Sequence, residues 1–227
     1  YKAAKAAGVK PIIGCEVYVA PRRMSDRVHG IDNDPYHLVL LCENRKGYEN
    51  LCKMVSEAFI NGFYGKPRVD WELLQSHHEG LIALSACLAG EIPKRLRNGE
   101  YENAKQYALQ MQEIFGPDRF YLEVQDHGIR EQAIVNQGVL RLHQETGIPM
   151  VCTNDAHYLR KEDAEAHDVL LCIQTGKTLD DENRMRFQTE EFYLKSEEEL
   201  RKLFLIVKVI DLHRDSAELF AVKGADL

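Results

Sequence analysis

Short apolar runs alternate with amphipathic stretches along most of this chain, and this alternation is the strongest constraint on its fold. The apolar runs have the length of strands. Between them, apolar residues recur at spacings of 3, 4 and 7, which predicts helices with one buried face. Helix and strand in turn, with short connections, indicate a mainly parallel α/β architecture. We expect strands at residues 11–19, 37–42, 80–86, 119–125 and 149–154, and helices at residues 2–7, 48–59, 70–74, 101–115 and 135–147.

The chain is long enough for one large or two modest domains, at 227 residues with 44% hydrophobic side chains. It shows neither an internal repeat nor a low-complexity linker. The opening run YKAAKAAGVKP has no initiating Met and resembles the second half of a helix. We therefore expect the natural protein to extend upstream of Tyr1.

The six cysteines form no Cys-x-x-Cys pair, and most lie in or beside apolar runs. This pattern favours small buried side chains in a reducing compartment over a disulfide framework or a structural zinc site. No stretch is apolar enough to span a membrane, and no signal peptide opens the chain, so we expect a cytoplasmic protein. The net charge of −7 argues against general electrostatic binding to the backbone of a nucleic acid. A local cleft whose cations are bound metals could still accept it.

Acidic and imidazole side chains gather where the predicted strands end. In the run VCTNDAHYL (151–159), an apolar strand leads into Asp155 and His157. Positions i and i+2 of extended backbone point to one face, so a carboxylate and an imidazole would lie side by side. Taken singly, Asp155 could equally cap a helix and His157 could be a structural histidine.

Three further residues extend this set. Glu16 lies within an apolar strand, where an unpaired carboxylate would be costly to bury. His37 opens the next strand, and His127 follows the strand 119–125, where turn chemistry is the alternative explanation. Carboxylates and imidazoles together suit Zn, Mn or Fe better than Ca. Two or three such ions facing a phosphate are typical of a phosphoester hydrolase, and no P-loop, GxGxxG or Ser-His-Asp pattern competes.

Several long motifs resemble one known family. They are GVKPIIGCEVYVAPR, YHLVLLCENRKGYENLCKMVS, FYLEVQDHG, TNDAHYLRKEDAEAHDVLLCIQTGKTLDDENR and FYLKSEEELRKLF. In this order they resemble the PHP (polymerase and histidinol phosphatase) domain of the alpha subunits of bacterial DNA polymerase III, the replicative C-family polymerases. The resemblance covers residues 1–204. It implies a PHP-type distorted (β/α)7 barrel, incomplete at its N-terminus because the family's first ligand motifs would precede Tyr1. Residues 205–227 do not match, and we expect them to be a tail of unclear origin.

The resemblance also implies a metal site. By similarity its ligands in this sequence are Glu16, His37, His127, Asp155 and His157. Asp155 and His157 would serve catalysis through the bound metal. The ions would be Zn or Mn, two or three in a complete domain. No DNA-binding residue is assigned.

The activity implied is that of a replication protein. The parent would be a DNA-directed DNA polymerase, a nucleotidyltransferase, and this segment a metal-dependent phosphoesterase resembling a 3′–5′ exonuclease. Its partners would be DNA, a proofreading exonuclease subunit and other replicase subunits, with no membrane. Two alternatives stay open: a non-catalytic module that stabilises the polymerase and docks the proofreading subunit, and a free-standing PHP phosphatase for a small phosphate monoester.

Overall fold

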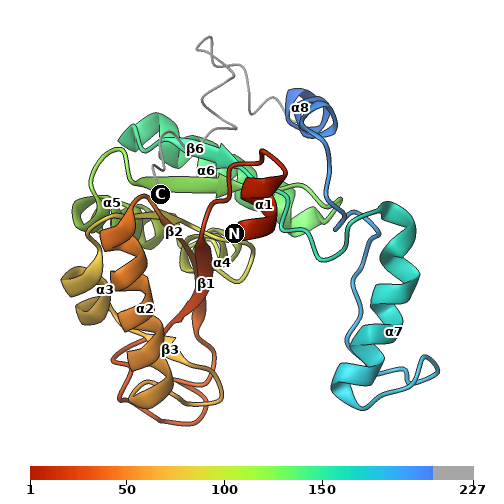
Figure 1. The fold of residues 1–227 in the computed structure, drawn as a ribbon, viewed down its shortest axis with the longest axis horizontal. Helices are drawn as coiled ribbons and strands as arrows, with labels where there is room; N and C mark the ends of the chain where they lie inside the picture. The colour runs from red at the N-terminus through yellow and green to blue at the C-terminus, as the bar shows by residue number, and fades with distance from the viewer. Residues whose placement is uncertain (207–227) are drawn as a thin grey trace.

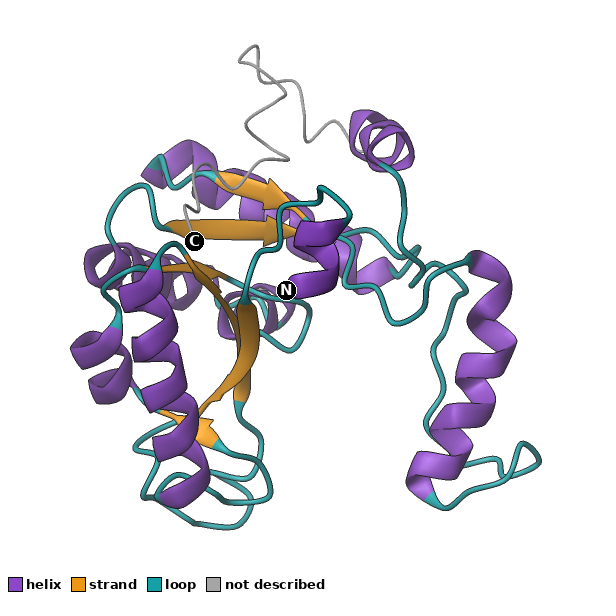
Figure 2. Cartoon of the chain, viewed as in Figure 1, coloured by secondary structure: helices purple, strands orange, loops and turns teal. Residues whose placement is uncertain are grey.

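A computed structural model describes residues 1–206, with side chains up to residue 204. Its centre is one six-stranded sheet with helices packed against it (Figures 1 and 2). The strand order is β3-β1-β2-β4-β5-β6, so β3 and β6 are the two edges and the sheet is open. The strands are β1 (Gly14–Val19), β2 (Tyr36–Cys42), β3 (Arg68–Val69), β4 (Leu81–Leu84), β5 (Phe120–Val124) and β6 (Met150–Cys152).

The sheet is mainly parallel, as the sequence predicts, with one reversed strand. β2 runs antiparallel to both of its neighbours, β1 and β4, whereas the pairs β1–β3, β4–β5 and β5–β6 are parallel. Because β2 is reversed, its first residues lie beside the last residues of the neighbouring strand β1. His37 is therefore paired opposite Tyr18. The open α/β sheet confirms the expectation of an incomplete barrel-like fold.

The helices begin where the sequence supplies capping side chains. Asn44 accepts a hydrogen bond from the Gly47 N–H at the start of α2, and Asp70 accepts one from the Leu73 N–H at the start of α3. Ser196 and Glu199 form a capping box at the start of α8. The elements are α1 (Lys2–Ala6), α2 (Arg45–Ile60), α3 (Trp71–His77), α4 (Glu91–Arg97), α5 (Tyr101–Phe115), α6 (Arg130–Thr146), the 3-10 turn η1 (Lys161–Asp163), α7 (Ala164–Thr175) and α8 (Glu197–Ile206).

Two of the elements up to β6 were not expected from the sequence. β3 has only two residues, too few for an apolar pattern, and α4 is seven residues long and contains Pro93. The expectation for residues 205–227 falls almost wholly outside the described residues. Only 205 and 206 are described, as the end of α8.

The buried face of α2 differs from the predicted one. The spacing predicts a face that includes Cys52 and Phe59, but both are exposed, and Met54 is fully buried instead. The reason is a close backbone approach: a Cβ atom at Gly47 would lie 1.8 Å from the Gly80 carbonyl oxygen. α2 therefore turns its glycine side toward the chain beside β4, and the buried set becomes Gly47, Asn50, Leu51, Met54 and Ala58.

Strand residues alternate between two apolar layers. Val17, Val19, Leu38 and Leu40 belong to the main core under the helices. On the other face, a smaller cluster of Ile82, Leu84 and Val151 packs against Val39, Leu41 and Tyr121. The side chains at positions 16 and 37 share this second face because β-strand side chains alternate. The core thus leaves one face of the sheet available for polar groups near the strand ends.

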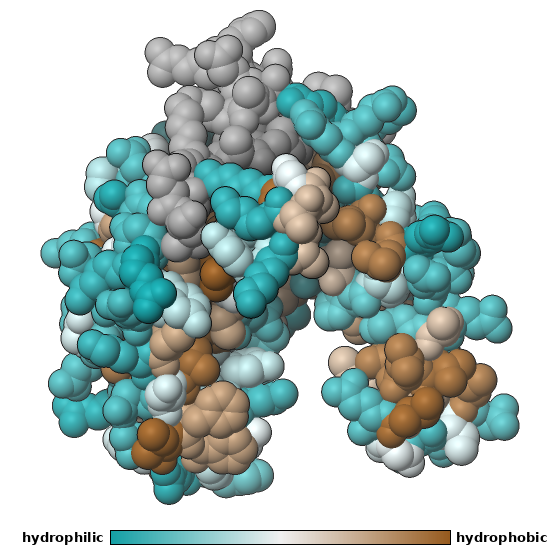
Figure 3. All heavy atoms as spheres, viewed as in Figure 1, coloured by the Kyte–Doolittle hydropathy of each residue, from teal (hydrophilic) through white to brown (hydrophobic). Residues whose placement is uncertain are grey.

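The segment after β6 projects from the body. α7 and the coil that follows it extend away from the sheet in Figure 1, and their apolar side chains include the exposed Leu170, Ile173 and Leu179 (Figure 3). Within the residues that the structure describes, no helix combines the length and hydrophobicity needed to cross a bilayer.

Candidate metal centre

Glu16 and His37 meet on the open face of the sheet. β1 and β2 are antiparallel neighbours, and Glu16 lies diagonally across from His37, one pleat away from the Tyr18–His37 pair. The distance from His37 Nδ1 to Glu16 Oε1 is 3.1 Å. Both side chains are partly accessible, at 25% for His37 and 39% for Glu16, so an ion could reach them.

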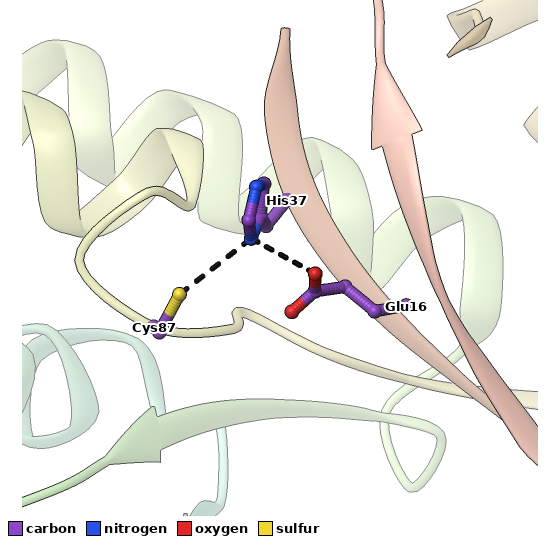
Figure 4. A group of neighbouring side chains, drawn as sticks. All are labelled: Glu16, His37 and Cys87. Atoms are coloured by element: carbon purple, nitrogen blue, oxygen red, sulfur yellow. Dashed lines mark hydrogen bonds and ion pairs between the residues drawn. The ribbon is translucent and has the colours of Figure 1, made fainter. Parts of the chain in front are cut away.

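Cys87 completes this group from a third segment. It lies in the loop between β4 and α4, and its Sγ is 3.6 Å from the same His37 Nδ1 (Figure 4). The ligand atoms of Glu16, His37 and Cys87 all lie within 4.8 Å of one another. Thiolate, imidazole and carboxylate are the ligand types of protein zinc sites.

The hydrogen-bonding demand on His37 points to a cation. A single ring nitrogen of a neutral imidazole either donates or accepts, yet Nδ1 faces both the Cys87 sulfur and the Glu16 carboxylate. Cys87 and then Glu16 raise the pKa of His37 to about 10, so the site stabilises positive charge at this point. A divalent ion bound here would satisfy all three atoms at once.

Asp155 and His157 form a second pair after β6. The distance from His157 Nε2 to Asp155 Oδ1 is 3.6 Å, and the two side chains are 41% and 27% exposed. Burial raises the pKa of the Asp155 carboxyl, but His157, His127 and His37 outweigh it and hold that pKa below its ordinary value. Because His37 contributes to this shift, the pair lies within the electrostatic field of the Glu16–His37–Cys87 group.

His127 lies behind the Asp155 loop. The side chain is 1% exposed, and burial lowers the pKa of its ring. Its Nδ1 accepts from the Gln132 amide at 2.7 Å and its Nε2 donates to the Asn154 carbonyl, while the ring stacks on Phe192 with centroids 4.2 Å apart. Metal ligation by Nε2 would require the ring to release Asn154, so a ligand role for His127 stays a prediction.

Cys87 was missed by sequence reasoning, although the available signal could have found it. The rule that chemistry gathers at strand ends selected residues after the other predicted strands, and Cys87 directly follows the strand expected at 80–86. The apolar neighbours of the cysteines instead predict buried packing residues. Cys42, Cys152 and Cys172 are indeed buried, whereas Cys87 is only partly so.

Aromatic rings surround the Asp155–His157 pair. His157 contacts Phe187 edge to face, with ring centroids 4.7 Å apart, and Phe192 at 5.8 Å. His167 of α7 also lies 5.8 Å from His157, and it packs on Phe187. Phe187 and Phe192 thereby pack against the ring of His157.

Comparison with known proteins agrees with this picture. A family model described as "PHP domain" matches residues 1–127. The chain is 49% identical over 204 residues to "DNA polymerase III subunit alpha" of Treponema pallidum, a match that covers 89% of this chain and 17% of that protein. The protein of the same name from Thermus aquaticus is 49% identical over 205 residues (89% and 17%), and that from Borreliella burgdorferi 45% over 205 (90% and 18%). The chain therefore spans less than a fifth of the length of these relatives.

Proposed function

Because this chain belongs to the PHP domain family, we propose that it forms the metal-binding PHP segment of a bacterial replicative DNA polymerase alpha subunit. The support is identity of 45–49% to proteins that carry this name, extending over nine-tenths of the chain. The parent activity would be DNA-directed DNA polymerisation in DNA replication, in the cytoplasm. Its partners would be DNA, a proofreading exonuclease subunit and other replicase subunits. In domain terms, residues 1–204 would be the PHP segment and 205–227 a separate tail.

For the segment itself we propose metal-dependent phosphoester hydrolysis of the 3′–5′ exonuclease type. The observation that carries this proposal is the convergence of Glu16, His37 and Cys87 within 4.8 Å. A bound Zn or Mn ion supplies Lewis-acid chemistry, activating water and neutralising charge on a phosphate. Asp155 and His157, with the predicted ligand His127, would bind a neighbouring ion and act in catalysis through it.

The protein's own residues prepare this site in three ways. Glu16 and His37 are held by the paired strands β1 and β2, which fixes their spacing. The Asp155 carboxylate remains ionised because of its histidine neighbours, which is the state that a metal ligand requires. The Phe187 and Phe192 rings restrain His157 by packing edge to face against its imidazole.

A structural role is the second candidate, favoured by one observation. α7 and its following coil expose apolar side chains, including Leu170 and Ile173, at 61% and 71%. Such a surface suits contact with another protein region, as expected for a module that stabilises the polymerase and docks a proofreading subunit. In that case the metals would hold the fold together without hydrolysis.

Metal content and 3′–5′ exonuclease activity, measured together on the full-length protein, test the proposal. Asp155→Ala should lose metal and at least about 100-fold in hydrolysis, because outer and inner ligands of catalytic metals contribute this much. Asp118→Ala, an exposed carboxylate before β5, is the matched control and should change neither. Unchanged hydrolysis in Asp155→Ala would reject the catalytic role. A wild-type protein that binds metal without hydrolysing DNA would support the structural role instead.

A further inference from the structure

A buried carboxylate that the proposed metal centre does not use lines a small cavity together with Cys87. Glu123 is in β5, between Leu122 and Val124 of the main core, and its side chain faces the other way. The residue is only 5% exposed. A carboxylate at this depth persists only where the surroundings hold it with hydrogen bonds.

Glu123 is bonded to the loop that carries Asp155. Its Oε1 accepts hydrogen bonds from the Thr153 hydroxyl and from the Gln125 amide, the latter at 2.9 Å. The same Gln125 nitrogen lies 3.1 Å from Thr153 Oγ1, which closes a three-residue network. Thr153 is two residues before Asp155, so the carboxylate restrains the start of that loop.

Glu123 also contacts the loop that carries Cys87. Its backbone N–H donates to Ser85 Oγ at 2.8 Å, and its side chain lines a small cavity together with Ala86 and Cys87. Ala86 directly precedes Cys87. One residue therefore contacts two loops that lie about 70 residues apart in sequence and that each present a proposed metal ligand.

Both loops adopt a backbone conformation that needs such restraint. Among the described residues, the non-glycine positions with positive φ are Ala86 at 64° and Asp155 at 42°. L-amino acids rarely adopt this region, and they keep it only where neighbouring contacts impose it. Ala86 and Asp155 belong to the two loops that Glu123 contacts, one position in each loop.

The carboxylate is sealed from substrate. A cavity of about 10 Å³ is lined by Glu123, Gln125, Ala86 and Cys87, among others, and has room for one water molecule at most. Glu123 Oε2 and Gln125 Oε1 are buried there, with no hydrogen-bond partner in the described part of the protein. A nucleic acid or a phosphate ester cannot reach these atoms, which argues for a supporting role.

We propose that Glu123 is a positioning residue that holds the Cys87 and Asp155 loops in their metal-binding geometry through its hydrogen bond to Thr153 and its packing beside Ala86. This inference rests on the proposed metal centre. It predicts that Glu123 controls metal affinity without binding the metal itself.

Zinc titration of the full-length protein against a competing chelator tests the inference, with folding checked by circular dichroism. Glu123→Ala should weaken zinc binding about 10- to 100-fold, as the loss of outer-shell partners does elsewhere, whereas Glu123→Gln should remain within about threefold because its amide oxygen still accepts from Thr153. Thr153→Val should weaken binding as well, and the double variant Glu123→Ala/Thr153→Val should be no weaker than Glu123→Ala alone.

The control is Asn50→Ala in α2. Its amide is buried and donates to the Glu79 carbonyl at 2.9 Å, so the substitution removes a buried hydrogen bond away from the metal centre. Zinc affinity should not change in this variant. A loss equal to that of Glu123→Ala would show that general destabilisation explains both and would overturn the positioning role.

The remaining outcomes separate this inference from the proposed function. Wild-type zinc affinity in folded Glu123→Ala would overturn the positioning role alone. A Glu123→Gln variant as weak as Glu123→Ala would overturn it in favour of direct ligation, and a wild-type protein without zinc affinity would overturn both proposals. If Glu123→Ala does not fold, amide hydrogen exchange of metal-free Thr153→Val decides: faster exchange at residues 85–87 and 153–157 supports the inference, and unchanged exchange overturns it.

Discussion

His37 is the residue on which the proposed site depends, because two chemically different neighbours compete for one of its nitrogens. Glu16 lies 3.1 Å and Cys87 3.6 Å from its Nδ1. A carboxylate and a thiol beside one imidazole nitrogen form a poor hydrogen-bond arrangement and a good set of metal ligands. The same argument makes Cys87 a stronger candidate than its sequence context suggests.

Removal of the thiol should therefore weaken metal binding. Cys87→Ala is expected to lower zinc affinity at least about 100-fold, equivalent to about 2.8 kcal/mol. Isothermal titration with zinc measures this directly. Cys172→Ala, a buried free cysteine in α7, is the control and should bind zinc like the wild type. Equal affinity in the two variants would exclude Cys87 from the site.

Much of the site could be predicted from the sequence because acids and imidazoles are conspicuous among apolar residues. The pattern selects Glu16, His37, Asp155 and His157, and the structure brings Glu16 to His37 and Asp155 to His157. Two features could not be found locally. The thiol of Cys87 is as suited to packing as to ligation, and the His127 ring is bonded by two later segments, at Gln132 and Asn154.

At the scale of elements, the direction of β2 determines where His37 lies. The five expected strands are all present, each within a few residues of its predicted bounds. Their apolar patterns, however, look the same for a parallel and an antiparallel neighbour, so the reversal of β2 could not be predicted from them. Without that reversal, His37 would lie at one end of the strands and the ligands that follow the strands would lie at the other end.

The contact between α2 and the chain before β4 should tolerate no side chain at Gly47. In Gly47→Ala the new Cβ would meet the Gly80 carbonyl oxygen at 1.8 Å, and backbone cannot yield as a flexible side chain can. We expect a loss of about 1–3 kcal/mol or more in the free energy of unfolding, measured with urea. Lys46→Ala, one position earlier and exposed, should leave it unchanged. Equal stability of the two variants would contradict this packing of α2.

Glu145 should make the contact between α5 and α6 sensitive to acid. Its carboxylate lies 2.8 Å from Lys105 Nζ and 2.7 Å from Arg141 Nε, and these partners lower the pKa of Glu145 to about 2. A folded-state pKa below the unfolded value of 4.5 means that the stabilisation is present above pH 4.5 and is lost as the pH falls toward 2.

Thermal unfolding measured at several pH values tests this direction of the change in stability. Glu145→Gln should be less stable than the wild type at pH 7, and the difference should shrink as the pH falls toward 2, where about half of the wild-type carboxyls are protonated. Glu113 is an exposed acid on α5, and Glu113→Gln should be as stable as the wild type at both pH values. A difference that persists unchanged at pH 2 would show that the charge of Glu145 is not its cause.

At the scale of the whole molecule, the proposed ligands connect distant parts of the chain. Glu16 lies on β1, next to the edge strand β3, and Asp155 follows β6, the edge strand on the other side of the sheet. Cys87 lies between them in sequence. An ion bound by such groups favours the folded state, because the unfolded chain cannot present them together.

Zinc should accordingly raise the melting temperature of the protein. At a free zinc concentration about 100-fold above Kd, the stabilisation is about 2.7 kcal/mol, or roughly 5–10 °C for a domain of this size. Differential scanning fluorimetry with zinc and with a chelator measures the shift. Glu16→Gln should reduce the shift sharply, and its full persistence would place the zinc elsewhere.

X-ray absorption spectroscopy of the zinc-loaded full-length protein tests the central claim most directly. If Glu16, His37 and Cys87 share an ion, the spectrum should show one sulfur at about 2.3 Å together with nitrogen and oxygen ligands at about 2.0–2.2 Å. The sulfur signal should disappear in Cys87→Ala and persist in Cys172→Ala. A shell of nitrogen and oxygen alone in the wild type would contradict the account, because the three side chains would then not bind a common ion.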